Sequence, residues 1–342
     1  MITPPLFAKK MLQFYDSQGR KDLPWQKNKT AYRVWLSEIM LQQTQVKTVI
    51  PYYLKFLQSF KSIEALAKAN LDHVLLLWAG LGYYSRARNL HACAKIVAND
   101  YAGQFPQDLT LLIKLPGIGE STAGAILSLA YDQPEAILDG NVKRVLARVF
   151  LVNGWYGVSK VNKQLWELSR KYTPKTRTGN FNQAMMDLGA SLCSRSKPQC
   201  ESCPLQKSCL AALAGKTAEY PHRKPKKKLP TKFATLNLIV NKQSQIQLNK
   251  RPPTGIWGGL WSLPEQNQTT EQTEQTKIIQ QFKHTFSHFH LQITVIKNNQ
   301  ALTSTRIEDS YQLAWHNINQ LKEVALPTPI KKFLYQHFNI KE

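Results

Sequence analysis

Acidic residues and long apolar runs are both scarce in this chain. It carries 22 aspartates and glutamates against 45 lysines and arginines, which gives a formal net charge of +23 at pH 7. Such a chain is expected to bind an extended polyanion. No apolar run is long enough to span a membrane, residues 1–10 lack the core of a signal peptide, and no basic amphipathic helix or lipidation motif is present. We therefore predict a cytoplasmic protein that binds nucleic acid and no membrane.

Cysteine is rare outside one short stretch. Four of the five cysteines are Cys193, Cys200, Cys203 and Cys209, spaced C-x6-C-x2-C-x5-C. The rest of the chain is too poor in cysteine for a disulfide framework, which favours a metal centre held by four thiolates. Zinc ribbons usually show two C-x2-C pairs, so the uneven gaps suit an iron–sulfur cluster better, and chance crowding of reduced thiols is the alternative. Cys93 lies in a helix-like stretch and is predicted to be a buried free thiol.

The hydrophobic pattern changes once along the chain, from helical spacing to strand-like runs. Apolar residues recur at helical spacing between short Gly/Pro breaks as far as residue 215, which predicts a compact, mostly α domain over residues 1–215. Residues 216–232 contain three prolines and seven lysines and arginines against one glutamate, which is typical of a semi-extended basic linker. Strand-like runs and a closing helix follow, which predicts a small α+β domain over residues 233–342.

Two glycines mark a turn between predicted helices, in the segment Leu115-Pro116-Gly117-Ile118-Gly119. Glycine permits positive φ and close approach of another backbone, and the N-terminus of the following helix offers N–H groups to phosphate. A plain helix–helix turn is the alternative. In so basic a chain, however, the pattern favours a helix-hairpin-helix motif, which holds the DNA backbone without reading sequence. Gly117, Gly119 and the nearby Ser121 are therefore candidate DNA-binding residues.

Two carboxylates have opposite surroundings in the sequence. Asp139 stands just before an apolar-periodic helix, where N–H donors and the helix dipole would lower its pKa and keep it ionised. On a helix Glu38 would lie among Val34, Trp35 and Leu41, and this apolar face would raise its pKa and suit it to carry a proton. The alternatives are a simple N-cap for Asp139 and a surface position for Glu38. The two form an acid/base pair only if the fold brings them together.

The hairpin, the aspartate after it and the cysteine loop together resemble the endonuclease III superfamily of DNA glycosylases. Within it the chain is similar to the adenine DNA glycosylase family, through the segments SEIMLQQTQV, GLGYYSRARNL, LPGIGESTAGAI, LDGNVKRVLAR and FNQAMMDLGA. The resemblance implies a mostly α helix-hairpin-helix glycosylase domain with an iron–sulfur loop over residues 193–209. It further implies one [4Fe-4S] cluster on the four cysteines of this loop. It also implies a monomer in the bacterial cytoplasm, associated with the nucleoid.

The resemblance also implies a reaction and roles for individual residues. The substrate would be double-stranded DNA in which adenine is mispaired with 8-oxoguanine or guanine, and the adenine would be flipped out of the duplex. Glu38 would protonate the adenine and later activate water. Asp139 would stabilise or trap the oxocarbenium-like sugar, and Asn141 would orient both groups. Gln43 and Tyr83 would wedge into the base stack beside the lesion.

One missing lysine separates this family from its bifunctional relatives. Those relatives carry a lysine just after the hairpin, which attacks the sugar as a Schiff-base nucleophile, whereas this chain has Ser121. We therefore expect little or no lyase activity. Some members of the family have an assisting tyrosine at this position, so the group that replaces it here stays open. A lyase for oxidised pyrimidines would need the lysine, and a non-catalytic iron–sulfur DNA-binding protein would not need the Glu38/Asp139 pair.

A metal-binding helix is missing from the C-terminal part. Residues 251–264 resemble nudix folds, but no R-E-x-x-E-E sequence follows Pro264. A lesion-reading, nudix-like α+β domain is therefore expected in place of a nudix hydrolase. The His284–His290 run resembles the loop with which the family contacts 8-oxoguanine, which implicates Phe286, Ser287 and His288. Metal binding by these histidines is the alternative.

Overall fold

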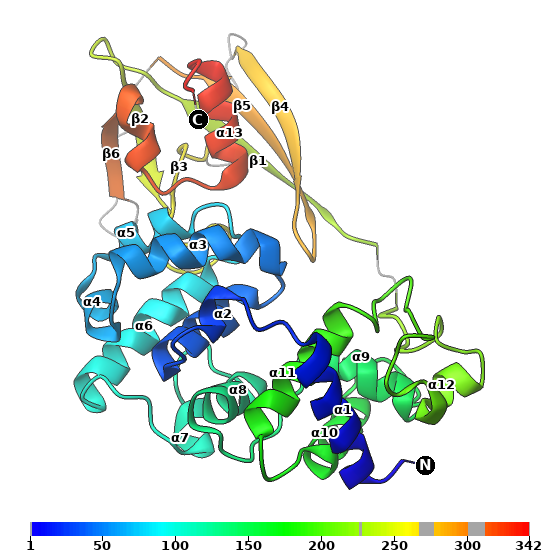
Figure 1. The fold of residues 1–342 in the computed structure, drawn as a ribbon. Helices are drawn as coiled ribbons and strands as arrows, with labels where there is room; N and C mark the ends of the chain where they lie inside the picture. Colours follow the sequence, from blue (N-terminus) through cyan, green and yellow to red (C-terminus); the bar gives the residue numbers. More distant parts are fainter. Residues whose placement is uncertain (1, 226–227, 267–276, 300–311, 342) are drawn as a thin grey trace. The chain divides into compact units, whose positions relative to one another are not determined.

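The chain packs as two compact units. The computed structural model describes residues 2–225, 228–266, 277–299 and 312–341 (Figure 1). The first unit comprises Met1–Lys68 and Ala92–Pro225, and the second comprises Ala69–His91 and Lys226–Glu342. Helix α6 (Ser85–Asp100) begins in the second unit and ends in the first. The glutamine-rich stretch after Pro264 lies largely outside the described residues.

The first unit is helical, as the sequence predicts. Besides the end of α6 it contains α1 (Pro4–Gln18), α2 (Ala31–Leu41), α3 (Val46–Ser59), α4 (Ile63–Lys68), α7 (Leu109–Ile113), α8 (Glu120–Tyr131), α9 (Gly140–Val149), α10 (Ser159–Tyr172), α11 (Thr178–Ala190) and α12 (Leu210–Leu213). Its core includes an aromatic cluster in which the Phe7 ring lies 5.2 Å from that of Tyr172 and 6.1 Å from that of Phe181. This cluster joins α1, α10 and α11, and α11 in turn packs against α8 and α9.

The continuous helix that apolar spacing predicts from Thr30 to Val49 is broken in the structure. Helix α2 begins after Thr30, whose side chain accepts a hydrogen bond from the Arg33 N–H, and it ends at Leu41. The four residues 42–45 are all polar, so the break costs no apolar burial, and Gln43 takes a left-handed φ of 58°. The break places Gln43 on an exposed turn between α2 and α3.

The second unit is the predicted α+β part together with a segment from much earlier in the chain. Strands β1 (Thr231–Leu238), β5 (His290–Lys297) and β4 (Ile278–Thr285) form one sheet in the order β1-β5-β4, in which β1 is parallel and β4 antiparallel to β5. Strands β3 (Trp261–Ser262), β2 (Gln245–Lys250) and β6 (Gln312–Asn317) form an antiparallel sheet in that order. Helix α13 (Thr328–His337) lies beside the first sheet, where the Phe333 and Phe282 rings stack at 6.1 Å.

Residues 69–91 are the early segment that packs into the second unit. They contain α5 (Leu71–Trp78), the following turn and the start of α6. The Lys250 ammonium of β2 lies 2.8 Å from the Asp72 carboxylate of α5, which ties this segment to the second sheet. A division of the sequence by texture alone does not anticipate this exchange, because residues 69–91 have the same helical spacing as their neighbours. No helix in the described ranges is long and apolar enough to cross a membrane.

Candidate active site and DNA-contact surfaces

Five of the residues singled out from the sequence line one cavity of about 900 Å³ in the first unit. They are Glu38, Gln43, Ser121, Asp139 and Asn141. Glu38 comes from α2, Ser121 from the first turn of α8, and the last two from the start of α9. Residues a hundred positions apart in the sequence therefore share one site. The fold brings the two carboxylates to the same cavity, as an acid/base pair requires.

Asp139 is held by hydrogen bonds at the N-terminus of α9. One of its carboxylate oxygens accepts the Val142 N–H at 2.8 Å, and the other accepts the Asn141 side-chain amide at 3.1 Å. The Asn141 amide oxygen in turn accepts an N–H of Arg144 at 2.8 Å. Helix α11 passes so close to Asn141 that a Cβ at Gly189 would lie 2.6 Å from the Asn141 Cβ. The orientation of Asp139 is thus fixed from two sides.

The predicted direction of the Asp139 pKa was wrong. The N-cap hydrogen bonds exist and lower the pKa, but burial raises it by more, so the pKa of Asp139 lies above its ordinary value. The sequence shows the capping position but not how deeply the folded chain buries this carboxyl group. The nearby Arg144 also favours the ionised form, though less than burial opposes it.

Glu38 follows the prediction. Burial raises its pKa to about 8, and the neighbouring charge of Asp139 adds to the rise. Because each negative charge disfavours the other, only one of the two carboxyl groups is ionised at neutral pH. Two N–H donors, from Val142 and Asn141, hold the charge on Asp139. The proton of the pair therefore resides on Glu38, and the negative charge on Asp139.

Ser121 points toward the backbone that carries Asp139. Its hydroxyl oxygen accepts the Leu138 N–H at 3.0 Å, which links the start of α8 to the residue before Asp139. Ser121 thus ties the start of α8 to the segment that carries Asp139.

Sequence reasoning missed several residues of this cavity. The amide side chains of Gln26, Gln42 and Gln183 line it, and so does the ammonium-bearing side chain of Lys143 on α9. Burial lowers the pKa of Lys143, while the charge of Asp139 opposes the change. Gln42, Lys143 and Gln183 fall in the separate segments SEIMLQQTQV, LDGNVKRVLAR and FNQAMMDLGA, and no local pattern shows that they share a cavity with Gln26. Only the fold gathers them.

The hairpin between α7 and α8 fits the helix-hairpin-helix expectation in part. Gly117 has a left-handed φ of 78°, whereas Gly119 caps α8 with a φ of −92° that any residue adopts. Of the two glycines, Gly117 therefore uses the positive φ that glycine permits, and Gly119 does not. No atom lies within 4 Å of a Cβ built at Gly119, and Ile118 between the glycines is buried. The N-terminus of α8 is thus open, with its N–H groups available to an anion.

The second unit contains its own cavity, of about 660 Å³. The residues predicted to contact the lesion line it, and they are Tyr83, Phe286, Ser287 and His288. The last three form the turn between β4 and β5, which the Phe286 N–H closes by donating to the Phe289 carbonyl at 2.9 Å. Tyr83 is 47% exposed on a turn with a φ of 48°. Part of the wall is an aromatic cluster, in which the ring centres of Phe289 and Trp257 lie 4.6 and 5.9 Å from that of Phe286.

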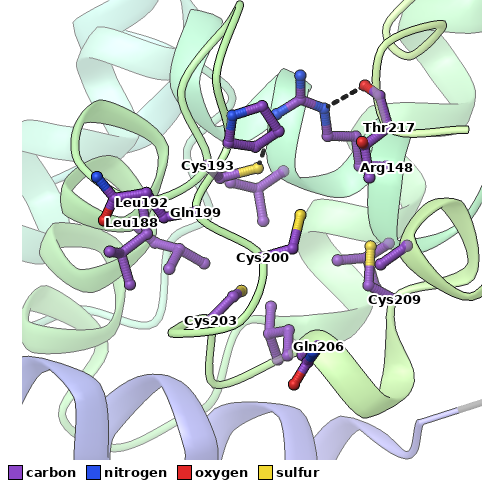
Figure 2. A pocket seen from close by; sticks show the side chains of 15 residues that line it. Arg148, Leu188, Leu192, Cys193, Gln199, Cys200, Cys203, Gln206, Cys209 and Thr217 are labelled. Carbon is purple, nitrogen blue, oxygen red and sulfur yellow. Dashed lines mark hydrogen bonds between the residues drawn. The ribbon is translucent and has the colours of Figure 1, made fainter. Parts of the chain in front are cut away.

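The four clustered cysteines surround one small space (Figure 2). Cys193 follows α11, Cys200 and Cys203 lie in the loop after it, and Cys209 precedes α12; all four are free thiols. An Arg148 N–H donates to the Cys193 sulfur at 3.3 Å (Figure 2). Arg148 is 2% exposed and also donates to the carbonyls of Ser194 and Tyr220.

Among the described residues, no three His, Cys, Asp or Glu side chains are placed to hold a metal ion. That finding covers the four clustered cysteines as well as the His284, His288 and His290 run, in which the His284 ring packs 4.6 Å from Phe286. Cys93 is completely buried and unpaired, as predicted, and burial raises its pKa to about 12.

Known protein families match both parts of the chain. Residues 36–171 match the HhH-GPD superfamily of base excision DNA repair proteins, and residues 235–336 match the NUDIX domain. An adenine DNA glycosylase of Buchnera aphidicola subsp. Acyrthosiphon pisum is 42% identical over 97% of this chain and 98% of its own length. A thermostable thymine-DNA glycosylase structure is 30% identical, with a TM-score of 0.55, over 62% of this chain and 97% of its own.

A structure of endonuclease III bound non-covalently to DNA shares the fold of the helical part. It is 22% identical, with a TM-score of 0.53, over 63% of this chain and 99% of its own. The resemblance seen in the motifs is confirmed, and so is a helix-hairpin-helix glycosylase part followed by a nudix-like part. The chain belongs to the adenine DNA glycosylases, hydrolases of base-excision repair that cleave adenine from DNA.

Proposed function

We propose that this enzyme removes adenine paired with 8-oxoguanine or guanine, and that it does so without cleaving the DNA strand. The observation that carries the proposal is the pairing of Glu38 and Asp139 in one cavity that has Ser121 at the lysine position. We further propose that residues 1–215 catalyse, residues 233–342 read the lesion and residues 216–232 join them. In this arrangement residues 69–91 pack with the lesion-reading part.

The first step is loss of the base. A flipped adenine enters the 900 Å³ cavity, which has ample room for a nucleoside. Glu38, whose pKa of about 8 keeps its proton at neutral pH, donates that proton to a ring nitrogen of adenine. The C1′–N9 bond then breaks, its electron pair leaves with the now neutral adenine, and an oxocarbenium-like sugar remains.

Asp139 stabilises that sugar. Its carboxylate is fixed by Val142 and Asn141 and carries the negative charge of the pair, so it faces the developing cation without reorganisation. It acts as a counter-charge or as a transient nucleophile, as in retaining glycosidases. Glu38, now ionised, accepts a proton from water as the water attacks C1′. The product is an abasic site, and Glu38 regains its proton.

The glutamine side chains of the cavity suit recognition of a base. An amide offers both a donor and an acceptor, so Gln26, Gln42 and Gln183 can hydrogen-bond the edge of adenine. The Gln183 amide N–H also donates to the buried Asp187 carboxylate at 2.9 Å, which leaves its oxygen free to accept from an exocyclic amine. Gln43, on its exposed turn, would enter the base stack.

Lesion reading is assigned to the second cavity. The exposed Tyr83 ring would stack beside the lesion, and the turn of Phe286, Ser287 and His288 would contact the 8-oxoguanine edge. A hydroxyl and an imidazole can tell the extra oxygen and N–H of 8-oxoguanine from guanine, because they supply a matching donor and acceptor.

We propose that Cys193, Cys200, Cys203 and Cys209 hold one [4Fe-4S] cluster. Four thiols around one apolar-walled space fit that group. Each of the four cysteines would supply one thiolate, to a separate iron of the cluster, so the four need not lie as close together as the ligands of a single metal ion. When bound, the cluster cross-links the loop. The loop would then present Arg195, Lys197 and Lys207 to the DNA backbone, together with the open α8 terminus. We place the enzyme, as a monomer, on the bacterial nucleoid.

A duplex assay tests the proposal. Purified protein should release free adenine from A:8-oxoguanine and A:G duplexes and leave abasic sites that are cut only after added base or heat. Nicking without that treatment, with a borohydride-trapped adduct, would indicate a lyase. Lys143 lines the cavity and burial lowers its pKa, so it is the candidate nucleophile for any weak trapped adduct. Loss of that adduct in Lys143→Gln would identify Lys143 as its source. Failure to release adenine from either duplex would contradict the proposal.

A further inference from the structure

We infer that Arg88 is a positioning residue for lesion discrimination, because it fixes the wedge residue Tyr83 against the lesion-contacting turn. The inference rests on the proposed lesion-reading role of the second cavity. Tyr83 and the turn of residues 286–288 are some 200 residues apart in sequence, and Arg88 holds them in a fixed arrangement in that cavity. Arg88 itself would not touch the reacting atoms.

Arg88 links the start of α6 to the glycine-rich loop of residues 251–261. Its guanidinium donates to the Gly258 carbonyl at 2.6 Å. The two segments are in close contact there, because a Cβ at Gly259 would lie 3.3 Å from Leu75 and 3.7 Å from the Arg88 side chain. A charged donor on a partly desolvated carbonyl forms a strong, directional bond. The side chain thus sets the spacing between α6 and the loop.

On the α6 side, the position of Arg88 is transmitted to Tyr83 through a stiff turn. The Arg86 guanidinium donates to the carbonyls of Leu81 and Gly82, at 3.1 Å each. It also lies 5.3 Å from the Trp78 ring and 5.6 Å from the Tyr83 ring. The Tyr83 ring therefore packs against the buried guanidinium of Arg86, which lies two residues before Arg88 in the chain.

On the loop side, the bond reaches the lesion turn through Trp257. This residue precedes Gly258, is 8% exposed and holds a left-handed φ of 54°. Its ring lies 5.9 Å from Phe286 and 6.0 Å from His284. A shift of the Gly258 carbonyl would therefore move Trp257, and with it the ring against which Phe286 packs. Arg88, Tyr83 and Trp257 line the same cavity. Arg88 therefore fixes the positions of two walls of the cavity, one at Tyr83 and one at Trp257.

The experiment measures single-turnover adenine excision from A:8-oxoguanine and A:G duplexes. Arg88→Met keeps the aliphatic stem and removes the donor, and Arg88→Lys keeps a charge with a shorter reach. Lys95→Met, on the exposed face of the same helix, is the matched control. We expect Arg88→Met to lower the 8-oxoguanine/guanine rate ratio about tenfold, mainly through the 8-oxoguanine substrate, with a smaller loss for Arg88→Lys and none for the control.

A double variant separates positioning from a general structural role. Combined with Ser287→Ala, Arg88→Met should lower the ratio little further, because both act on the same contact. A merely structural role would instead slow both substrates alike and leave the ratio unchanged. An unchanged ratio in Arg88→Met and Arg88→Lys, beside a wild type that prefers 8-oxoguanine, would overturn the inference. A wild type without that preference would instead count against the proposed lesion-reading role.

Discussion

The cavity around Glu38 and Asp139 and the cavity around Phe286 are lined by different kinds of side chain. The catalytic cavity gathers carboxylates, amides and an amine, whose protonation depends on burial and on each other. The lesion cavity is walled by Trp257, Phe286 and Phe289, whose contacts depend on ring packing. The first should therefore respond to charge and pH for every substrate alike. The second should respond to changes in ring packing and in the hydrogen-bonding groups of its turn, and these should change only the preference between substrates.

The largest effect is expected from Asp139→Asn. Asparagine still caps α9, so the fold is kept, but the negative charge facing the sugar is lost. We expect single-turnover excision to fall by about a thousandfold or more on both duplexes, with DNA affinity retained. Asp100→Asn, at the exposed end of α6, serves as the control. Full activity of the Asp139 variant would refute the catalytic role of the first cavity.

The next effect is a pH dependence that follows from Glu38. Its pKa is raised to about 8, so the proton needed by adenine is present below that pH and is lost as the pH rises through it. Single-turnover rates should thus fall about tenfold per pH unit above about 8. The fall should be the same for A:8-oxoguanine and A:G, which leaves their ratio flat. A profile flat to pH 9.5 would show that Glu38 is not the acid.

A smaller, substrate-specific effect should come from Phe286→Ala. Its removal leaves Trp257 and Phe289 without their shared ring contact and loosens the lesion turn. We expect the 8-oxoguanine/guanine rate ratio to fall roughly fivefold to tenfold, while excision from A:G changes little. Phe233→Ala removes the same side chain from a 77% exposed site on β1 and should change neither rate. Equal losses on both duplexes would remove the distinction between the two cavities.

The sequence predicts the local positions of Glu38 and Asp139 better than their electrostatics. Local patterns around Glu38 and Asp139 identify the helix face and the N-cap, because both features are short-range. The pKa of Asp139 went the other way, because its desolvation depends on how the folded chain buries the carboxyl group, which no local pattern shows. Likewise, the helical spacing of residues 69–91 cannot show that they pack with a part of the chain more than 150 residues later. The contacts are those of Asp72 with Lys250 and of Arg88 with Gly258.

The smallest effect on chemistry is expected where the sequence signal is strongest, at the cysteine loop. Cys200→Ala should lose iron, lower the thermal midpoint and weaken DNA binding, because the loop that carries Arg195, Lys197 and Lys207 loses its cross-link. At saturating enzyme, however, the chemical step should stay within about threefold of wild type, since Glu38 and Asp139 line another cavity. Cys93→Ser is the matched control, with iron content unchanged. A Cys200→Ala protein that folds and binds DNA but fails specifically in excision would show that the cluster site acts on the catalytic cavity. The path would then run through Arg144, which donates both to the Cys193 carbonyl and to Asn141.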